Sequence, residues 1–162
     1  MKYLLIISCL LFTSISWSKD VNWNELVERD GLFYEKFTRE PFTGNVLGKQ
    51  QGKISKGVKD GEWIVWYSSG QLNKKENYKD GKSDGEWLWY HDNGQLWKKR
   101  NYKDGKQEGE YLYYEYNGQL RVKSNYKDDK REDSEQYVYD VNGELEKTEI
   151  FKDDKLIKII KP

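Results

Sequence analysis

Few side chains in this 162-residue sequence could perform chemistry. The only histidine is His91 and the only cysteine is Cys9, so a catalytic triad or a two-histidine metal site lacks its partners. Carboxylates are abundant, and a glycosidase-like pair is compatible with the composition. The most regular of them recur at equivalent positions of a repeated unit: Glu62, Glu86, Glu110 and Glu135. Because a catalytic constellation is normally unique, we expect no enzymatic activity and no cofactor.

Metal binding is also not expected. The acidic pairs Asp128-Asp129 and Asp153-Asp154 could attract Ca²⁺, but they lack the alternating oxygen ligands of a dedicated loop. Asp favours local backbone hydrogen bonds, so these pairs are typical of turns. His91 stands beside a predicted tight turn, where the equivalent residues are Tyr67 and Glu115. It is interpreted as a surface residue.

Aromatic side chains are the remaining candidates for function. The chain has seven Trp and thirteen Tyr, and aromatic residues make up 15% of it. Disordered chains lack such residues, so the high charge content does not indicate disorder here. Exposed aromatic rings among Lys and Asn are typical of surfaces that bind protein or polysaccharide. Which rings share a surface depends on the elements that carry them.

Those elements follow from an internal repeat. Similar units begin at Gly61, Gly85, Gly109 and Ser134, with a period of about 24 residues. Within each unit, two runs rich in β-branched and aromatic residues flank a turn signal such as Asn93-Gly94. A second turn, such as Asp104-Gly105, joins consecutive units. The sequence predicts an all-β fold, an elongated antiparallel meander of stacked β-hairpin repeats in a single curved sheet.

The length of the hairpin loop decides which face is buried. A two-residue Asn93-Gly94 loop would place Leu96 beside His91, Trp89 and Trp87, and a three-residue loop with a bulge would place it beside Tyr90 and Leu88. We favour the three-residue loop, because one set of positions is apolar or aromatic in all four units and is therefore expected to form the core. That set comprises Ile64, Trp66, Leu72 and Tyr78; Leu88, Tyr90, Leu96 and Tyr102; Leu112, Tyr114, Leu120 and Tyr126; Tyr137, Tyr139, Leu145 and Phe151.

The opposite face is then the candidate binding face. Its predicted binding residues are Trp63, Trp87, Trp89, Trp97, Tyr111, Tyr113, Lys75, Lys99 and Lys123, together with an asparagine ladder of Asn77, Asn101 and Asn125. A second interpretation is that these rings pack on one another and on Lys stems, which would stabilise a single-layer sheet without any ligand.

The remaining segments complete the predicted organisation. Residues 1–18 have a basic start, an apolar run and the small residues Ser16 and Ser18, which predicts a signal peptide cleaved after Ser18 or after Ser16. An uncleaved anchor is the alternative, although the run is short for a membrane span. Cleavage would leave a chain without thiols. The other expected parts are an N-terminal cap with irregular hairpins at 19–60, one of them on Asp30-Gly31, four repeats at 61–84, 85–108, 109–133 and 134–151, and a C-terminal capping strand or tail at 152–162.

The units, with the pattern G-x-W-x-x-Y-Y-x-x-G-x-L followed by Y-x-D-G, resemble MORN-type repeats in the bacterial variant described as YwqK-family antitoxin-like. Pro41-Phe42-Thr43-Gly44 ahead of the first unit adds to the resemblance, which covers about residues 26–155. The resemblance implies a non-enzymatic protein-binding scaffold. It also suggests an antitoxin role, membrane association, or a surface role for exported members.

The first hypothesis is therefore an exported scaffold, periplasmic or secreted, that binds a toxin or a cell-surface protein. The alternatives are a module that binds carbohydrate or another cell-envelope polymer, a membrane-associated scaffold, and self-association through sheet edges. Because 28 basic residues balance 28 acidic residues, no field of one sign attracts nucleic acid, which we do not expect as a partner.

Overall fold

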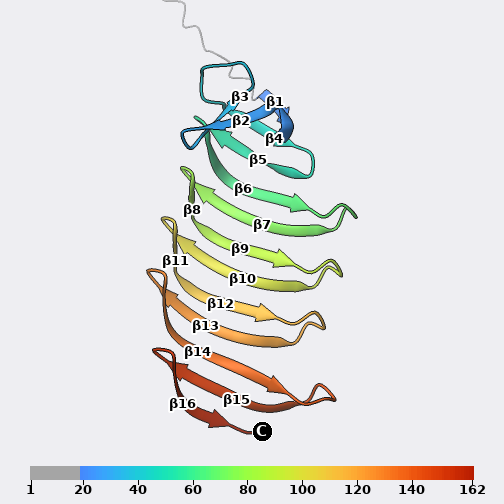
Figure 1. Cartoon of the computed structure of the whole chain (residues 1–162), viewed down its shortest axis with the longest axis vertical. Helices are drawn as coiled ribbons and strands as arrows, with labels where there is room; N and C mark the ends of the chain where they lie inside the picture. The colour runs from blue at the N-terminus through green and yellow to red at the C-terminus, as the bar shows by residue number, and fades with distance from the viewer. Residues whose placement is uncertain (1–18) are drawn as a thin grey trace, which may run out of the picture.

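The chain folds as one long β-ribbon (Figure 1). The computed structural model describes residues 19–162, so the predicted signal peptide and Cys9 lie outside the described residues. Fourteen strands form a single sheet, and β2 (Leu26–Arg29) and β3 (Leu32–Glu35) form a separate two-stranded sheet. A 3₁₀ turn, η1 (Trp23–Glu25), precedes them. The predicted all-β meander of hairpins is confirmed.

Each repeat supplies one long hairpin, and the hairpins follow one another along the sheet in sequence order. Very short strands, β8 (Lys82–Ser83) and β11 (Lys106–Gln107), extend two of the connections. The long hairpins are β6 (Val58–Trp66) with β7 (Leu72–Lys79), β9 (Gly85–Tyr90) with β10 (Leu96–Lys103), β12 (Gly109–Tyr114) with β13 (Leu120–Lys127), and β14 (Lys130–Tyr139) with β15 (Leu145–Lys152).

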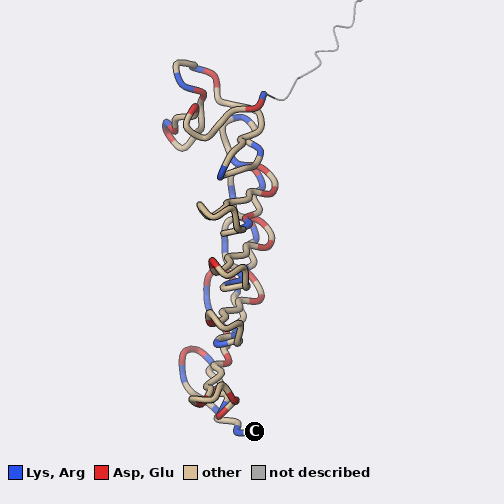
Figure 2. Tube along the Cα trace, turned by 90° about the vertical axis from the view of Figure 1, so that its right-hand side faces the viewer, with Lys and Arg blue, Asp and Glu red and all other residues tan. Residues whose placement is uncertain are grey.

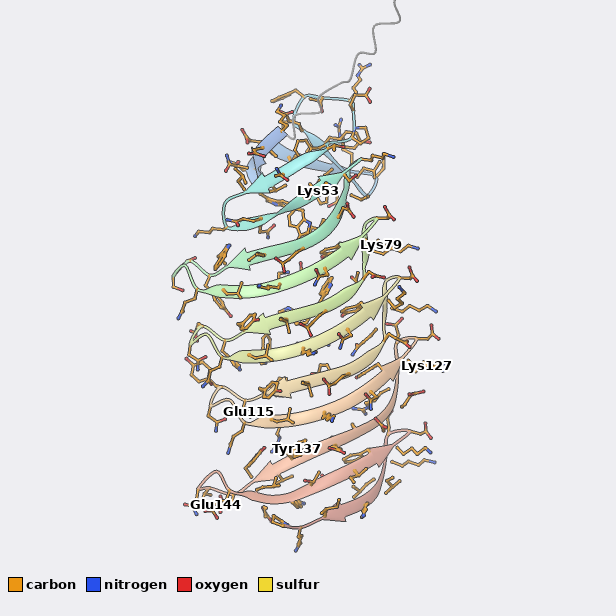
Figure 3. The ribbon with its side chains drawn as sticks, turned by 180° about the vertical axis from the view of Figure 1, so that it is seen from behind. Lys53, Lys79, Glu115, Lys127, Tyr137 and Glu144 are labelled. Carbon is orange, nitrogen blue, oxygen red and sulfur yellow. The ribbon has the colours of Figure 1, made fainter. Side chains whose placement is uncertain are left out.

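Two kinds of turn occupy the two long edges of the ribbon. At the hairpin tips, the His91 amide donates to the Gln95 carbonyl at 2.8 Å and the Gly94 amide donates to the His91 carbonyl at 3.0 Å. This closes the predicted three-residue loop, in which Gly94 has φ +85°. Between hairpins, Asp104 and Gly105 both have positive φ, as a two-residue primed turn requires. In Figure 3, Lys79 and Lys127 mark the edge with these turns, and Glu115 and Glu144 mark the edge with the tips.

A second irregularity follows each tip and was not predicted. Leu96 pairs with Tyr90 as expected, but the next residue on β10 to pair is Lys98, which lies opposite Trp89. The extra residue, Trp97, forms a β-bulge that moves the rest of β10 by one residue. Tyr102 therefore lies opposite Gly85, on the side of the sheet that carries Trp87 and Trp89.

The bulge recurs in every repeat and defines two faces. Directly opposed residues share a face, so the register assigns each row. The leucine face carries Ile64, Lys75, Leu88, Lys99, Leu112 and Lys123 in one continuous row. The tryptophan face carries Trp63, Val65, Lys74, Glu76 and Tyr78, then Trp87, Trp89, Lys98, Arg100 and Tyr102, then Tyr111, Tyr113, Val122, Ser124 and Tyr126.

The prediction that these sixteen residues share one face and form the core is therefore wrong. Its first three members in each repeat, such as Leu88, Tyr90 and Leu96, lie on the leucine face, whereas the fourth, such as Tyr102, lies on the tryptophan face. None of its sixteen members is buried, because the repeat region is a single layer with solvent on both sides (Figure 2).

The buried core lies at the N-terminal end instead. Its members are Val21, Leu26, Phe42, Val46, Ile54 and Trp63. They come from β1 (Lys19–Asn22), β2, β4 (Gly44–Leu47), β5 (Gln50–Ser55), β6 and the segment before β4 that contains Phe42. The N-terminal end of the ribbon projects to one side (Figure 2). The hairpin on Asp30-Gly31 is confirmed. Strand β1 was not predicted, and it pairs with β4 in parallel, so the meander is not antiparallel throughout.

The fourth hairpin is displaced relative to the others. Lys75 pairs with Leu88 and Lys99 with Leu112, so repetition would place Lys123 opposite Tyr137; it lies opposite Glu135, two residues away. The earlier hairpins begin with a glycine of positive φ, for example +99° at Gly85. Ser134 occupies this position in the fourth unit without positive φ, and β14 runs through it continuously. An L-residue disfavours that conformation. The fourth unit also has one residue more before this position, with four steps from Lys130 to Ser134 against three from Lys106 to Gly109.

The final strand, β16 (Lys155–Ile160), pairs with β15 at the C-terminal edge of the sheet, where the sequence predicted a capping strand. Its residues are all exposed, and Lys155 and Lys158 each precede two apolar side chains. Lysine on an edge strand disfavours pairing with another chain. Within residues 19–162, no helix is long and apolar enough to cross a membrane.

Candidate binding face

Trp87 is the centre of a packed group of rings on the tryptophan face. Its ring centroid lies 5.2 Å from Tyr78, 5.7 Å from Trp89 and 4.9 Å from Tyr102, at interplanar angles of 51–53°. Its indole Nε1 donates to the Asn77 carbonyl at 2.9 Å. Because aromatic pairs prefer such tilted geometries, this group stabilises the junction of the first two repeats while staying half-buried.

A second group of rings lies at the tip of the second hairpin. The Trp97 ring lies 5.8 Å from His91 and 6.5 Å from Tyr113, and His91 lies 5.1 Å from Tyr116. The Tyr116 hydroxyl donates to Asp92 at 3.0 Å. His91 was interpreted as a surface residue beside a turn; it lies beside the turn but is half-buried between consecutive tips.

Two cations that were not predicted for this face lie over these rings. Lys98 Nζ lies 4.4 Å from the Trp97 ring centroid and 5.4 Å from that of Trp89. The Arg100 guanidinium lies 5.9 Å from Trp89 and 5.5 Å from Tyr111. Partial burial, with a further contribution from the Arg100 charge, lowers the pKa of Lys98. Once the bulge at Trp97 is known, the alternation of Lys98 and Arg100 places both on this face; without it, they would be assigned to the other.

The predicted lysines lie on the opposite face, which corrects the assignment. Lys75, Lys99 and Lys123 pair with leucine-face residues, and the asparagine ladder accompanies them. Lys99 binds Glu86 at 2.6 Å, and this hydrogen bond is the main cause that raises the pKa of Lys99. Equivalent pairs join Lys75 to Glu62 and Lys123 to Glu110. The recurring glutamates therefore form a charge ladder with these lysines.

Trp63 was also predicted to be accessible, and this is wrong. It lies on the tryptophan face but is fully buried beneath the N-terminal cap. The Trp23 ring packs edge-on against it at 5.7 Å, and Lys59 Nζ lies 4.5 Å from its centroid. Of the predicted aromatic residues, Trp87, Trp89, Trp97, Tyr111 and Tyr113 share the face and are only half-buried.

The acidic turn residues link adjacent turns. The Gln107 backbone N–H donates to Asp129 Oδ1 at 2.8 Å, and Lys106 binds Asp128 at 2.8 Å. Arg131 pairs with Asp154 in the same way. Among the described residues, no cluster of three or more His, Cys, Asp or Glu side chains has a geometry that could hold a metal ion.

Tyrosine titration predicts a loss of stability at high pH. Partial burial, followed by a 2.5 Å hydrogen bond to Glu135, raises the pKa of Tyr137 from 10.0 to about 12, and burial beside Glu76 raises that of Tyr78 further. A phenol with a raised folded-state pKa contributes stability that is complete below pH 10 and is lost as pH rises through the folded value. We expect the urea midpoint to fall between pH 10 and 12, and Tyr137→Phe to reduce this fall. An equal fall in wild type and Tyr137→Phe would contradict the assignment to Tyr137.

Comparison with known families agrees with this architecture. Residues 59–80, 83–104 and 107–128 each match the MORN repeat variant. Three segments of the chain are therefore similar to MORN repeats. Each matched segment spans one hairpin and ends at the first residue of the following turn, and the second and third segments contain Trp87, Trp89, Trp97, Tyr111 and Tyr113. MORN repeats often serve as scaffolds that bind proteins or membranes. No curated protein and no solved structure shows significant similarity to the chain.

Proposed function

We propose that the protein is an exported, non-enzymatic MORN-repeat scaffold that binds another protein through the tryptophan face of its second and third repeats. The observation that carries the proposal is the uncovered part of this face. Trp89, Trp97 and Tyr113 are half-buried, and no described element lies over them. Large amphipathic rings with partial exposure are the side chains that most often contribute binding energy at protein interfaces.

The N-terminal cap supports this choice of face. The cap places Trp23 and Phe33 against Trp63, so the tryptophan face of the first repeat already holds a peptide segment. A partner bound to the second and third repeats would continue this packing along the ribbon. The leucine face offers its own ion-pair ladder instead, in which the Lys99 charge is already neutralised by Glu86.

The signal-like residues 1–18 support export, and a toxin or a cell-surface protein is the proposed partner. In this proposal the protein neutralises the toxin or anchors the surface component by occupying its surface, without catalysis. Affinity capture with the protein as bait, in extracts of its native host, identifies the partner, which is then purified and titrated.

Substitution of two half-buried indoles of the tryptophan face tests the proposal. We expect Trp89→Ala combined with Trp97→Ala to weaken binding of the purified partner at least about tenfold, because each removes a large interface ring. Tyr90→Ala is the matched control: it removes a ring from the neighbouring position of the same strand but on the leucine face, and binding should be unchanged. Circular dichroism confirms folding. If Tyr90→Ala abolishes partner binding and the Trp89→Ala, Trp97→Ala variant still binds the partner, the interface lies on the leucine face.

The carbohydrate alternative makes a separate prediction. Sugar rings stack on flat, open aromatic platforms, whereas Trp87 and Trp89 are tilted by 52° and Lys98 lies over Trp89 and Trp97. We therefore expect no saturable change of tryptophan fluorescence when cell-wall fragments are added up to millimolar concentration. A saturable fluorescence shift that disappears in the Trp89→Ala, Trp97→Ala variant would show that the face binds a polysaccharide and would contradict the proposed protein partner.

A further inference from the structure

The second repeat differs from its neighbours in the charges that it places on the tryptophan face. The equivalent positions hold Lys74 and Glu76 in the first repeat, Lys98 and Arg100 in the second, and Val122 and Ser124 in the third. Lys74 binds the buried Glu76 at 2.6 Å, so the first repeat neutralises its own cation.

The second repeat has no such compensation. Among residues 19–162, neither Lys98 nor Arg100 forms an ion pair, and Arg100 Nε is buried without a hydrogen-bond partner. The contacts of these cations are with rings and with the Tyr102 hydroxyl, at 3.3 Å from Arg100. Two adjacent cations with unused donors favour a carboxylate or another anion.

The N-terminal cap shows what such a face binds when it is covered. Lys59 lies over Trp63, Trp23 and Tyr78, and Phe33 of the cap packs against the same core. Glu28 is an exposed residue that lies beside Trp23 and Phe33. Glu28 lies opposite Phe33 in the cap hairpin, on the side that also carries Leu26. Burial lowers the pKa of Lys59, and the carboxylates of Glu76 and Glu28 oppose this. The segment docked on the first repeat therefore combines aromatic rings with a carboxylate.

We infer that Lys98 and Arg100 bind carboxylate side chains of an acidic, aromatic-containing segment of the partner protein, which lies on Trp89, Trp97 and Tyr111 beside the cap. This rests on the proposed function and specifies the chemistry of its partner. Such a segment would bring aromatic rings and a carboxylate to the second repeat, as the cap brings Trp23, Phe33 and Glu28 to the first.

The charge distribution favours a short acidic segment over a polyanion. Nucleic acids and anionic membranes are bound by many cations, about four to eight for a lipid surface. Here two cations stand together on a chain with no net charge. Two carboxylates matched to two cations would leave the rings to provide most of the affinity.

Synthetic peptides test the inference. The probe is a peptide that alternates Glu and Phe, with a Gln–Phe peptide as the neutral control, and tryptophan fluorescence reports binding. We expect the Glu–Phe peptide to bind saturably and at least about tenfold more tightly than the Gln–Phe peptide. Vesicles of phosphatidylcholine and phosphatidylserine form a third arm; binding of these vesicles without binding of the Glu–Phe peptide overturns the inference in favour of a membrane.

Variants that copy neighbouring repeats locate the effect. Arg100→Glu recreates the Lys74–Glu76 pair, and Lys98→Val with Arg100→Ser copies the third repeat, which provides a second variant if the first fails to fold. Both should weaken Glu–Phe binding at least about tenfold. Lys99→Glu, on the leucine face, should not change it. Unchanged binding in both folded variants overturns the inference.

The same variants separate this inference from the proposed function. If the captured partner depends on Trp89 and Trp97 but binds Arg100→Glu as tightly as wild type, the protein-binding face stands and the acidic segment is wrong. If the indole variants also leave the partner bound, both are wrong.

Discussion

Trp63→Ala is expected to lower the free energy of unfolding by about 3–5 kcal/mol, the cost of truncating a fully buried aromatic side chain. Trp63 is the largest fully buried side chain and connects the cap to the first repeat through Trp23, Phe33 and Tyr78. Its loss opens a cavity at the only two-layer part of the described chain. Urea denaturation followed by circular dichroism measures the effect.

Trp97→Ala is the matched comparison, because the same residue type is removed from a half-buried position. Trp97→Ala should lower the free energy of unfolding by about 1–2 kcal/mol. Equal losses for Trp63→Ala and Trp97→Ala would contradict the burial of Trp63 by the cap. They would also restore Trp63 to the accessible binding residues.

Gly52→Ala is expected to destabilise the protein by about 1–3 kcal/mol or more, although it adds a single methyl group. A Cβ at Gly52 would lie 2.4 Å from the Trp63 indole, which closes over the bare backbone of β5. The backbone of Gly52 does not have positive φ, so the cost arises from the contact alone. The same urea titration gives the magnitude.

A double variant isolates that contact. Trp63→Leu removes the ring that the new methyl group meets, so Gly52→Ala should cost less in the Trp63→Leu background than in wild type. Additive losses would show that the indole does not cover Gly52. Gly94→Ala tests backbone conformation instead: its Cβ meets nothing within 4 Å, and only the positive φ is penalised, by about 1 kcal/mol.

The hairpins could be predicted because each turn depends on residues that are adjacent in the sequence. Asn93-Gly94 and Asp104-Gly105 supply the positive φ that each turn requires, and the repeat fixes the order of the hairpins. The bulge at Trp97 could not be predicted in this way. It contains neither Gly nor Pro, and it arises from pairing with Trp89 and Tyr90 on the neighbouring strand.

This one unpredicted residue explains most errors in the candidate site. Beyond the bulge, every residue of β10 changes face, which moved Lys99 away from the rings and brought Lys98 and Arg100 to them. The aromatic residues on β9 and β12 precede any bulge, so Trp87, Trp89, Tyr111 and Tyr113 were correctly grouped. Burial of Trp63 depends on Trp23 and the β2–β3 hairpin, a long-range contact that no local pattern contains.

Engineered cysteine pairs test most directly whether consecutive hairpins pair in one sheet and which residues lie on each face. In a Cys9→Ser background, Lys98→Cys with Tyr113→Cys places two thiols at directly opposed positions of consecutive hairpins, within the Cα separation that a disulfide needs. Lys98→Cys with Leu112→Cys places them on opposite faces. We expect rapid disulfide formation under mild oxidation for the first pair alone, as measured by a mobility shift in non-reducing electrophoresis. A disulfide in the second pair, or in neither, would contradict the account.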